Sequence, residues 1–185
     1  MTLATLIKEA KDGSNTAQEA LFNELSEWMF RLCLRYVKNE EDAEERMQDG
    51  FYKFFTSLST FTYVSDANLH AWLKSIMIRE CLLQLRKKNV FTIIAESNAE
   101  DIPVTKDALD NLSAAEITHL INSLPVGYRT VFNLNMVEGM EHKEIAGLLG
   151  ISEGTSWSQL SKAKCLLQKM LLSKNNDYVR YTSTK

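Results

Sequence analysis

The sequence predicts an all-α protein built from two small helical domains that a flexible linker joins. Only two prolines and seven glycines occur in 185 residues, and apolar residues recur at helical spacing on both sides of one irregular stretch. The hydrophobic content of 45% and the charged content of 24% are those of ordinary globular proteins, which argues against a disordered or fibrous chain. A chain of this length can hold one large or two small domains.

The first domain is expected over residues 1–88 and should contain helices separated by short turns. Residues 2–37 have a helical periodicity that is interrupted at "KDGSN", where Gly13 and Asn15 supply turn chemistry. Two further helices are expected over residues 40–58 and 66–88. The apolar stripe of the first consists of Phe51, Phe54, Phe55 and Leu58. The apolar stripe of the second consists of Leu69, Leu73, Ile76 and Leu83.

The linker and the second domain follow. Residues 89–113, "NVFTIIAESNAEDIPVTKDALDNLS", lose the helical periodicity and contain one of the two prolines, so we interpret them as the linker. The helical pattern resumes at Ala114 and continues to about Leu172, with breaks at "LPVGY", "EGM" and "GIS" that divide it into four short helices. The second domain is therefore expected over residues 114–173, and residues 174–185 form a tail.

Charge is distributed unevenly along the chain, although the net charge is only −3. Residues 39–50 contain six acids and one arginine, a local net charge of −5. Residues 79–88 and residues 153–174 each contain four basic residues and one acid, a local net charge of +3. The chain therefore has one acidic and two basic regions, which the overall charge conceals.

Several classes of protein are not expected. The three cysteines and three histidines lie far apart, so no pair has the spacing of metal ligands, and we expect neither a metal nor another cofactor. No apolar run approaches the roughly 18 residues that span a bilayer, and "MTLATLIKEAKDG" contains no cleavage-site pattern, so we expect a cytoplasmic protein without membrane insertion. No nucleophile, base and orienting group occur at a motif spacing, so an enzyme is not expected.

The stretch "HKEIAGLLGISEGTSWSQLSKAKCLLQKML" has the pattern of a helix-turn-helix. Ala146 is small where one helix must approach its partner, and Gly150 can end the first helix by adopting a left-handed conformation. Ile151 is expected to fill the turn. Ser152 is a natural N-cap, so the second helix should begin at Glu153.

The second helix should bury one stripe and expose the opposite face. The stripe is expected to consist of Ser156, Leu160, Ala163, Leu167 and Leu171, and the exposed face of Gly154, Thr155, Ser158, Ser161, Lys162 and Lys169. Small hydroxyl side chains can enter the major groove of DNA, while the helix N-terminus and the lysines can reach phosphates. The alternative is that Ser, Thr and Glu are favoured at any exposed helix start, and that lysine near a helix end balances the helix dipole.

These residues also resemble a known family, the bacterial RNA polymerase sigma factors of the extracytoplasmic-function (ECF) subgroup. "LPVGYRTVFNLNMVEGMEHKEIAGLLGISEGTSWSQLSKAKCLLQKML" resembles region four of that family, while "AQEALFNELSEWMFRLCLRYVKNEEDAEERMQDGFYKFF" and "AWLKSIMIRECLLQLRKKN" resemble region two. The resemblance covers roughly residues 5–172. It implies a transcription initiation factor that binds core RNA polymerase, recognises promoter DNA and helps to open it, and that an anti-sigma factor often holds when free.

The resemblance also implies three groups of site residues. Those that would contact the minus-thirty-five element are Ser152, Glu153, Gly154, Thr155, Trp157, Ser158, Gln159, Ser161 and Lys162. Those that would contact the minus-ten element, on the loop "SLSTFTYVSDAN" and the following helix, are Phe61, Tyr63, Trp72, Arg79, Arg86, Lys87 and Lys88. Those that would dock on the polymerase are Asp42, Glu45, Gln48 and Asp49, whose acidic face is alternatively a solvated helix surface.

The sequence departs from the family pattern at several of these positions. Many members carry lysine at position 157 and arginine at positions 162 and 164, where this chain has Trp157, Lys162 and Lys164. Tryptophan cannot neutralise a phosphate, so affinity for the minus-thirty-five element is expected to be weaker. Trp157 lies at the edge of the buried stripe, so its ring either packs on the domain surface or contacts thymine methyls or a sugar in the groove. Arg79 and Leu83 likewise replace an asparagine and an aspartate.

Two other functions are compatible with parts of the sequence. A helix-turn-helix regulator that acts without polymerase would need a dimer interface or sensor domain, whereas the first half resembles region two. A divergent sigma-like protein that serves as a protein-interaction adaptor would explain the departures from the family pattern.

Overall fold

The computed structural model describes residues 1–87 and 113–182, and the side chains within them except those of Ala114 and residues 174–182. The regular secondary structure of the described residues is entirely helical, which confirms the all-α prediction. The chain divides into two compact units, Met1–Lys88 and Asn89–Lys185, and each is described by itself. The expected linker, residues 89–113, lies outside the described residues apart from its last residue.

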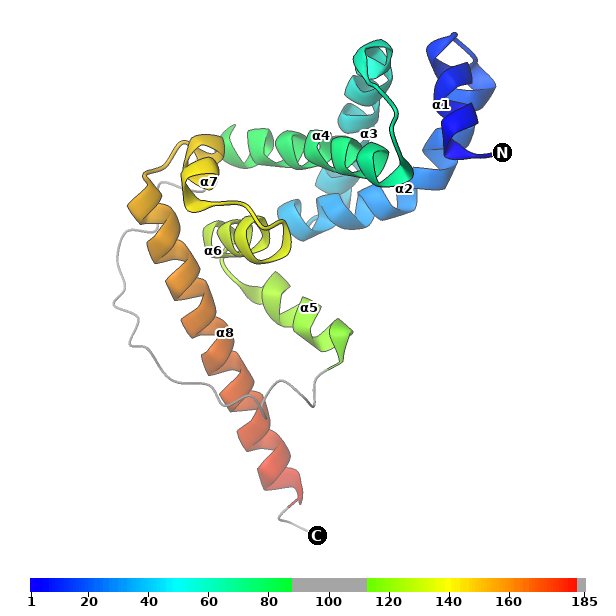
Figure 1. Cartoon of the computed structure of the whole chain (residues 1–185). Coiled ribbons are helices and arrows are strands. Elements are labelled where there is room, and N and C mark those ends of the chain that lie inside the picture. Colours follow the sequence, from blue (N-terminus) through cyan, green and yellow to red (C-terminus); the bar gives the residue numbers. More distant parts are fainter. Residues whose placement is uncertain (88–112, 183–185) are drawn as a thin grey trace. The chain divides into compact units, whose positions relative to one another are not determined.

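The N-terminal unit contains four α-helices and one short 3₁₀ turn within its described residues (Figure 1). These are α1 (Leu3–Lys11), α2 (Asn15–Val37), α3 (Glu40–Ser57), η1 (Leu58–Thr60) and α4 (Asp66–Lys87). The predicted interruption after α1 is confirmed, because Gly13 adopts a positive φ of 90° and the Ser14 hydroxyl caps α2 by accepting from the Ala17 N–H. The next turn places Lys38 in the left-handed conformation, and the Asn39 side chain caps α3.

The core of this unit lies between α2, α3 and α4, each of which packs against the other two, while α1 packs against α2. Its fully buried side chains include Leu21, Met29, Phe54, Leu73 and Met77. Burial of one such side chain contributes about 1.5–3 kcal/mol. The three-helix core therefore holds the flanking surfaces of α3 and α4 in fixed positions.

The structure corrects the predicted apolar stripe of α4 at one position. Leu69 and Leu73 are buried as expected, but Leu83 is 43% exposed. Because α4 crosses both α2 and α3, its buried side shifts along its length and includes Cys81 and Leu85 instead.

The C-terminal unit contains helices α5 (Ala114–Ser123), α6 (Val126–Phe132), α7 (His142–Leu149) and α8 (Glu153–Thr182), with a π-helical segment, η3 (Asn133–Val137), that continues α6. The three predicted breaks are confirmed. The prediction that the helical pattern ends near Leu172 is wrong, because α8 continues to Thr182. The π-helical segment was not predicted; it is in contact with α7.

The core of the C-terminal unit lies along α8. Leu124, Tyr128 and Ala163 form its buried centre, and Phe132 and Leu167 pack against them. Within residues 1–87 and 113–182, no helix combines the length and the apolar character that crossing a membrane requires.

Candidate nucleic-acid and polymerase interfaces

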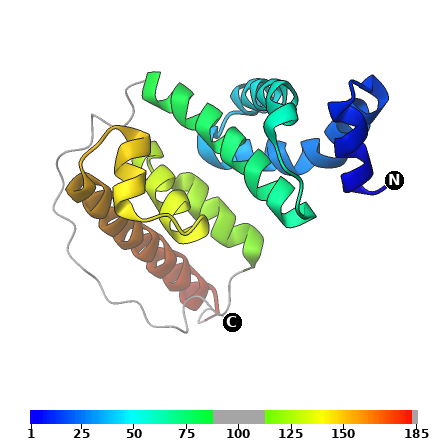
Figure 2. The ribbon, with the colours of Figure 1, turned by 45° about the horizontal axis from the view of Figure 1, so that its top comes forward.

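The turn between α7 and α8 has the geometry that the sequence predicts for a helix-turn-helix. Gly150 ends α7 in the left-handed conformation, at φ 68°, and its N–H donates to the Ala146 carbonyl at 2.9 Å. The N–H of the half-buried Ile151 donates to the same carbonyl at 3.1 Å. The Ser152 hydroxyl accepts from the Thr155 N–H at 3.0 Å, which confirms Ser152 as the cap of α8. Figure 2 shows α7 lying beside the start of α8.

The first three turns of α8 expose a continuous stripe in which three of the five residues are small. The exposed residues are Glu153, Gly154, Trp157, Ser158 and Ser161, which follow one another at spacings of one and three residues along the helix. Thr155 and Lys162 lie beside the stripe and are half-buried. The opposite face buries Ser156, Leu160, Ala163 and Leu171, as predicted, with Leu167 half-buried. The structure therefore places a bare, hydroxyl-rich surface at the start of α8.

Gln159, one of the predicted minus-thirty-five contacts, does not lie on this exposed stripe, because it is only 2% exposed. It lies against α6: a Cβ added to Gly127 would be 3.3 Å from Gln159 Oε1. The buried side of α8 is wider than the predicted stripe, since α6 and α7 both pack on it.

The ring of Trp157 in α8 packs against His142 of α7 and is still exposed to solvent. Its ring stacks on the imidazole of His142, with the ring centroids 3.8 Å apart and an interplanar angle of 28°. His142 is 5% exposed, and its Nδ1 is hydrogen-bonded to the buried Ser156 hydroxyl at 2.8 Å, whereas Trp157 is 58% exposed. The sequence left open whether this ring packs on the domain or faces outward. In the structure, the ring packs on His142 and also remains exposed to solvent. The role of His142 was missed, since only the fold brings it beside α8.

The acidic side chains of α3 are hydrogen-bonded by a neighbouring amide and partly neutralised by Arg46. Asp42 accepts a hydrogen bond from Gln84 Nε2 at 2.6 Å. Arg46 forms ion pairs with Glu45 and with Asp49, the latter at 2.8 Å. Burial by itself would lower the pKa of Arg46, but the hydrogen bond to Glu45 and the charge of Asp49 raise it, so its cation persists.

The predicted polymerase-docking residues share one side of α3. Glu45 and Gln48 are exposed, while Asp42 and Asp49 are half-buried. They therefore form one surface, in which each of the three carboxylates is hydrogen-bonded or ion-paired and the Gln48 amide is exposed.

In the loop before α4, Phe61, one of the predicted minus-ten contacts, is buried, with only 8% of its surface exposed. Its ring stacks on half-buried Trp72, with centroids 4.3 Å apart and planes at 6°, and its carbonyl accepts a hydrogen bond from Lys11 Nζ. Phe61 thus anchors the loop to the helical core. A buried aromatic in a loop cannot be distinguished from an exposed one by sequence alone.

The other predicted minus-ten residues are accessible, apart from Lys88, which lies outside the described residues. The half-buried Tyr63 donates a hydrogen bond from its hydroxyl to Asp66, which raises the pKa of Tyr63. The exposed residues of α4 on this side include Arg79, Leu83, Arg86 and Lys87. Leu83 thus lies between cations.

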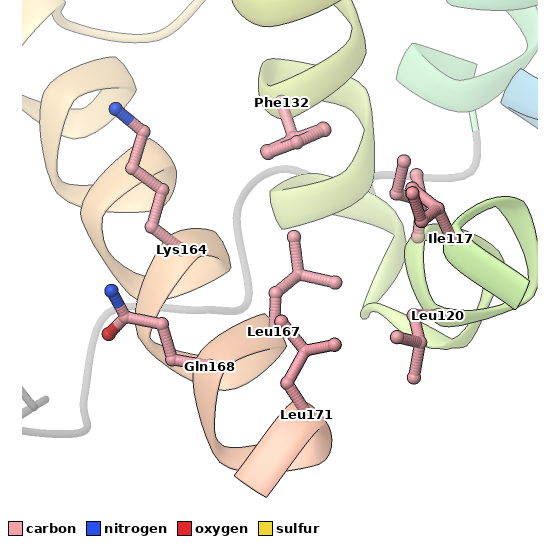
Figure 3. A pocket seen from close by; sticks show the side chains of 8 residues that line it. Ile117, Leu120, Phe132, Lys164, Leu167, Gln168 and Leu171 are labelled. Carbon is pink, nitrogen blue, oxygen red and sulfur yellow. The ribbon is translucent and has the colours of Figure 1, made fainter. Parts of the chain in front are cut away.

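A separate apolar groove of about 240 Å³ lies further along α8, between that helix and α5 and α6 (Figure 3). Its lining residues are Ile117, Leu120, Ile121, Phe132, Lys164, Leu167, Gln168 and Leu171. Such a lining suits apolar side chains better than nucleic acid. Among the described residues, no group of three or more His, Cys, Asp or Glu could hold a metal ion.

Comparison with known proteins gives one match in each unit. The family model of Sigma-70 region 2 matches residues 21–90, and that of Sigma-70, region 4 matches residues 114–167, so together they cover more than half of the chain. RNA polymerase sigma factor SigV of Bacillus subtilis (strain 168) is 25% identical over 142 residues, which are 77% of this chain and 83% of SigV.

Two further relatives match over a larger part of the chain. The ECF RNA polymerase sigma factor SigM of Mycobacterium tuberculosis (strain ATCC 25618 / H37Rv) is 26% identical over 169 residues, 91% of this chain and 84% of SigM. The ECF RNA polymerase sigma factor SigW of Bacillus subtilis (strain 168) is 24% identical over an aligned length of 185, and the match covers 92% of this chain and 97% of SigW. The chain therefore belongs to the sigma-70 family of bacterial RNA polymerase sigma factors, in its ECF subgroup, and is a transcription initiation factor.

Proposed function

We propose that the C-terminal unit binds the minus-thirty-five element through the exposed stripe at the start of α8. The observation that supports this most directly is the small-residue surface of Gly154, Ser158 and Ser161 on the second helix of a helix-turn-helix. Gln159 is left out of the proposed contact residues because it is buried. The proposed contact residues are Ser152, Glu153, Gly154, Thr155, Trp157, Ser158, Ser161 and Lys162.

The N-terminal unit has the proposed task of holding the opened minus-ten element. Tyr63 and Trp72 supply aromatic groups beside the loop, and Arg79, Arg86 and Lys87 supply cations along α4. Lys88, which follows Lys87 in the sequence, is also proposed as one of these cations. Leu83 is also on this surface, where it can offer an apolar contact but no hydrogen bond to a base.

The docking surface for core polymerase is proposed to be the acidic side of α3, with Asp42, Glu45, Gln48 and Asp49. Charge complementarity with a basic partner surface would favour a single orientation and speed association. The substitution Glu45→Lys is expected to weaken binding to core polymerase, and Glu24→Lys, the same change at an exposed position of α2, serves as the matched control.

One experiment separates the sigma function from its alternatives. The purified chain is mixed with core polymerase from the source organism, tested for co-purification, and then assayed for transcription from the promoter upstream of its own gene. A sigma factor gives both binding and initiation. Binding without initiation indicates an adaptor, and DNA binding without polymerase indicates an independent regulator.

The proposed role places the protein in the cytoplasm, where RNA polymerase acts. It assigns no catalytic reaction and no cofactor to the chain. An anti-sigma factor that holds the free protein is the proposed regulator, and when it is added to the purified chain and core polymerase it should compete with core polymerase for the chain.

A further inference from the structure

The exposed stripe of α8 offers few charged groups and one large apolar group. Of its five members, Glu153 is the only ionisable residue, Gly154, Ser158 and Ser161 are small, and Trp157 is the large one. This surface therefore presents hydroxyl groups, one carboxylate and an indole to a DNA groove. The apolar group that base pairs present in the major groove is the C5 methyl of thymine.

The indole is also held in place before any DNA arrives. His142 supports it at 3.8 Å between ring centroids, and the imidazole itself is buried and hydrogen-bonded to Ser156 at 2.8 Å. A side chain fixed in this way loses little conformational entropy on binding, so a contact at its open surface is retained in the affinity. A tryptophan that served only to cover α7 would not need to leave 58% of its surface exposed.

We propose that Trp157 determines specificity by packing against the C5 methyl of a thymine in the upstream promoter element, and that His142 is its positioning residue. The inference rests on the proposed binding of this element by α8. It predicts that the chain prefers thymine at one or two positions for the methyl group itself, and not for the hydrogen-bonding edge of the base.

The test uses holoenzyme and a duplex library that is randomised over the upstream element. Bound duplexes are selected with the wild-type chain and with Trp157→Ala, each from a library made with thymidine and from one made with deoxyuridine, which lacks the methyl. Trp28→Ala is the matched control, because Trp28 is a partly exposed tryptophan that also contacts a histidine ring, His70, but lies in the other unit.

The wild-type chain and Trp28→Ala are expected to enrich thymine at the same position, and to lose that preference in the deoxyuridine library. Trp157→Ala is expected to show no preference there in either library. On one enriched duplex, replacing that single thymidine by deoxyuridine should weaken binding of the wild-type holoenzyme about fourfold, the value for one buried methyl group, and should leave Trp157→Ala unchanged.

The outcomes distinguish a failure of the proposed DNA binding by α8 from a failure of the inference about Trp157. If no upstream sequence is enriched by the wild-type chain, the proposed binding by α8 is wrong and the inference falls with it. If a sequence is enriched but the preference survives in Trp157→Ala, or the deoxyuridine duplex binds as well as the thymidine duplex, only the inference is overturned.

The role of His142 is tested by a pair of variants whose folding is followed by thermal unfolding. His142→Ala removes the support, and His142→Phe keeps a ring beneath the indole. The alanine variant should lose the discrimination between thymidine and deoxyuridine, and the phenylalanine variant should restore it. Equal discrimination in a folded His142→Ala protein would overturn the positioning role.

Discussion

Gly50 of α3 lies directly against the side chain of Met77 of α4: a Cβ added to Gly50 would be 2.2 Å from Met77 Sδ. Both residues are buried, and Met77 is fully so. The absence of a side chain at position 50 therefore sets how closely the two helices can approach.

The substitution Gly50→Ala is expected to destabilise the N-terminal unit by about 1 kcal/mol. Alanine gains up to about 1 kcal/mol of helix propensity, but the overpacking against Met77 costs about 1–3 kcal/mol. Chemical denaturation measures the difference. The control is Gly147→Ala in α7, where the added Cβ meets nothing within 4 Å, and which should stabilise the protein by about 0.5–1 kcal/mol. A Gly50→Ala protein as stable as the wild type would show that Met77 can move aside.

A second prediction concerns the charge that the family carries at position 157. Trp157→Lys should tighten DNA binding and steepen its dependence on salt, since one added phosphate contact raises the log–log slope by about 0.9. Fluorescence anisotropy of a labelled promoter duplex across a salt series measures this slope. An unchanged slope would mean that a side chain at position 157 does not reach a phosphate.

A third prediction follows from the two buried thiols of the N-terminal core. The hydrogen bond between Cys81 and Cys33, together with burial, raises the pKa of Cys81 well above its usual range. The unfolded thiol has a pKa of about 8.5, so at higher pH the unfolded state loses a proton that the folded state keeps. The free energy of unfolding should therefore be unaffected below about pH 8 and fall by about 1.4 kcal/mol per pH unit above about pH 9.

Urea denaturation at pH 8, 9 and 10 measures this loss. In Cys81→Ala the contribution of this thiol is absent, so the decline in stability with pH should be shallower than in the wild type. Equal declines in the two proteins would contradict the prediction.

A fourth prediction separates folding from DNA binding on opposite faces of one turn of α8. Ser156 is fully buried and bonded to His142, so Ser156→Ala leaves a buried imidazole nitrogen without its partner and should cost about 1–2 kcal/mol of stability. Ser158 is exposed, so Ser158→Ala should change stability by less than about 0.5 kcal/mol.

The effects on promoter binding are expected to be different. Ser158→Ala should weaken binding to the upstream element because it removes a hydroxyl from the proposed contact surface. Thermal unfolding and anisotropy on the same two variants test the pair. A Ser158→Ala protein that binds normally would remove that residue from the contact surface.

The sequence by itself determined the helices and most of their boundaries. Gly13, Asn39, Gly150 and Ser152 act on backbone groups within a few residues of themselves, so their effects are visible without the fold. The periodicity of apolar residues is likewise local, and it was sufficient to predict an all-α chain with a helix-turn-helix near its C-terminal end.

Only the tertiary structure decided which side chains of those helices are exposed at the sites. Phe61 and Gln159 are buried because Trp72 and Gly127, which lie 11 and 32 residues away in the numbering, pack against them. Leu83 is exposed because α4 turns its buried side towards two helices at once. The physical reason is that exposure depends on what lies across the helix interface, and the chain's local sequence does not specify that neighbour.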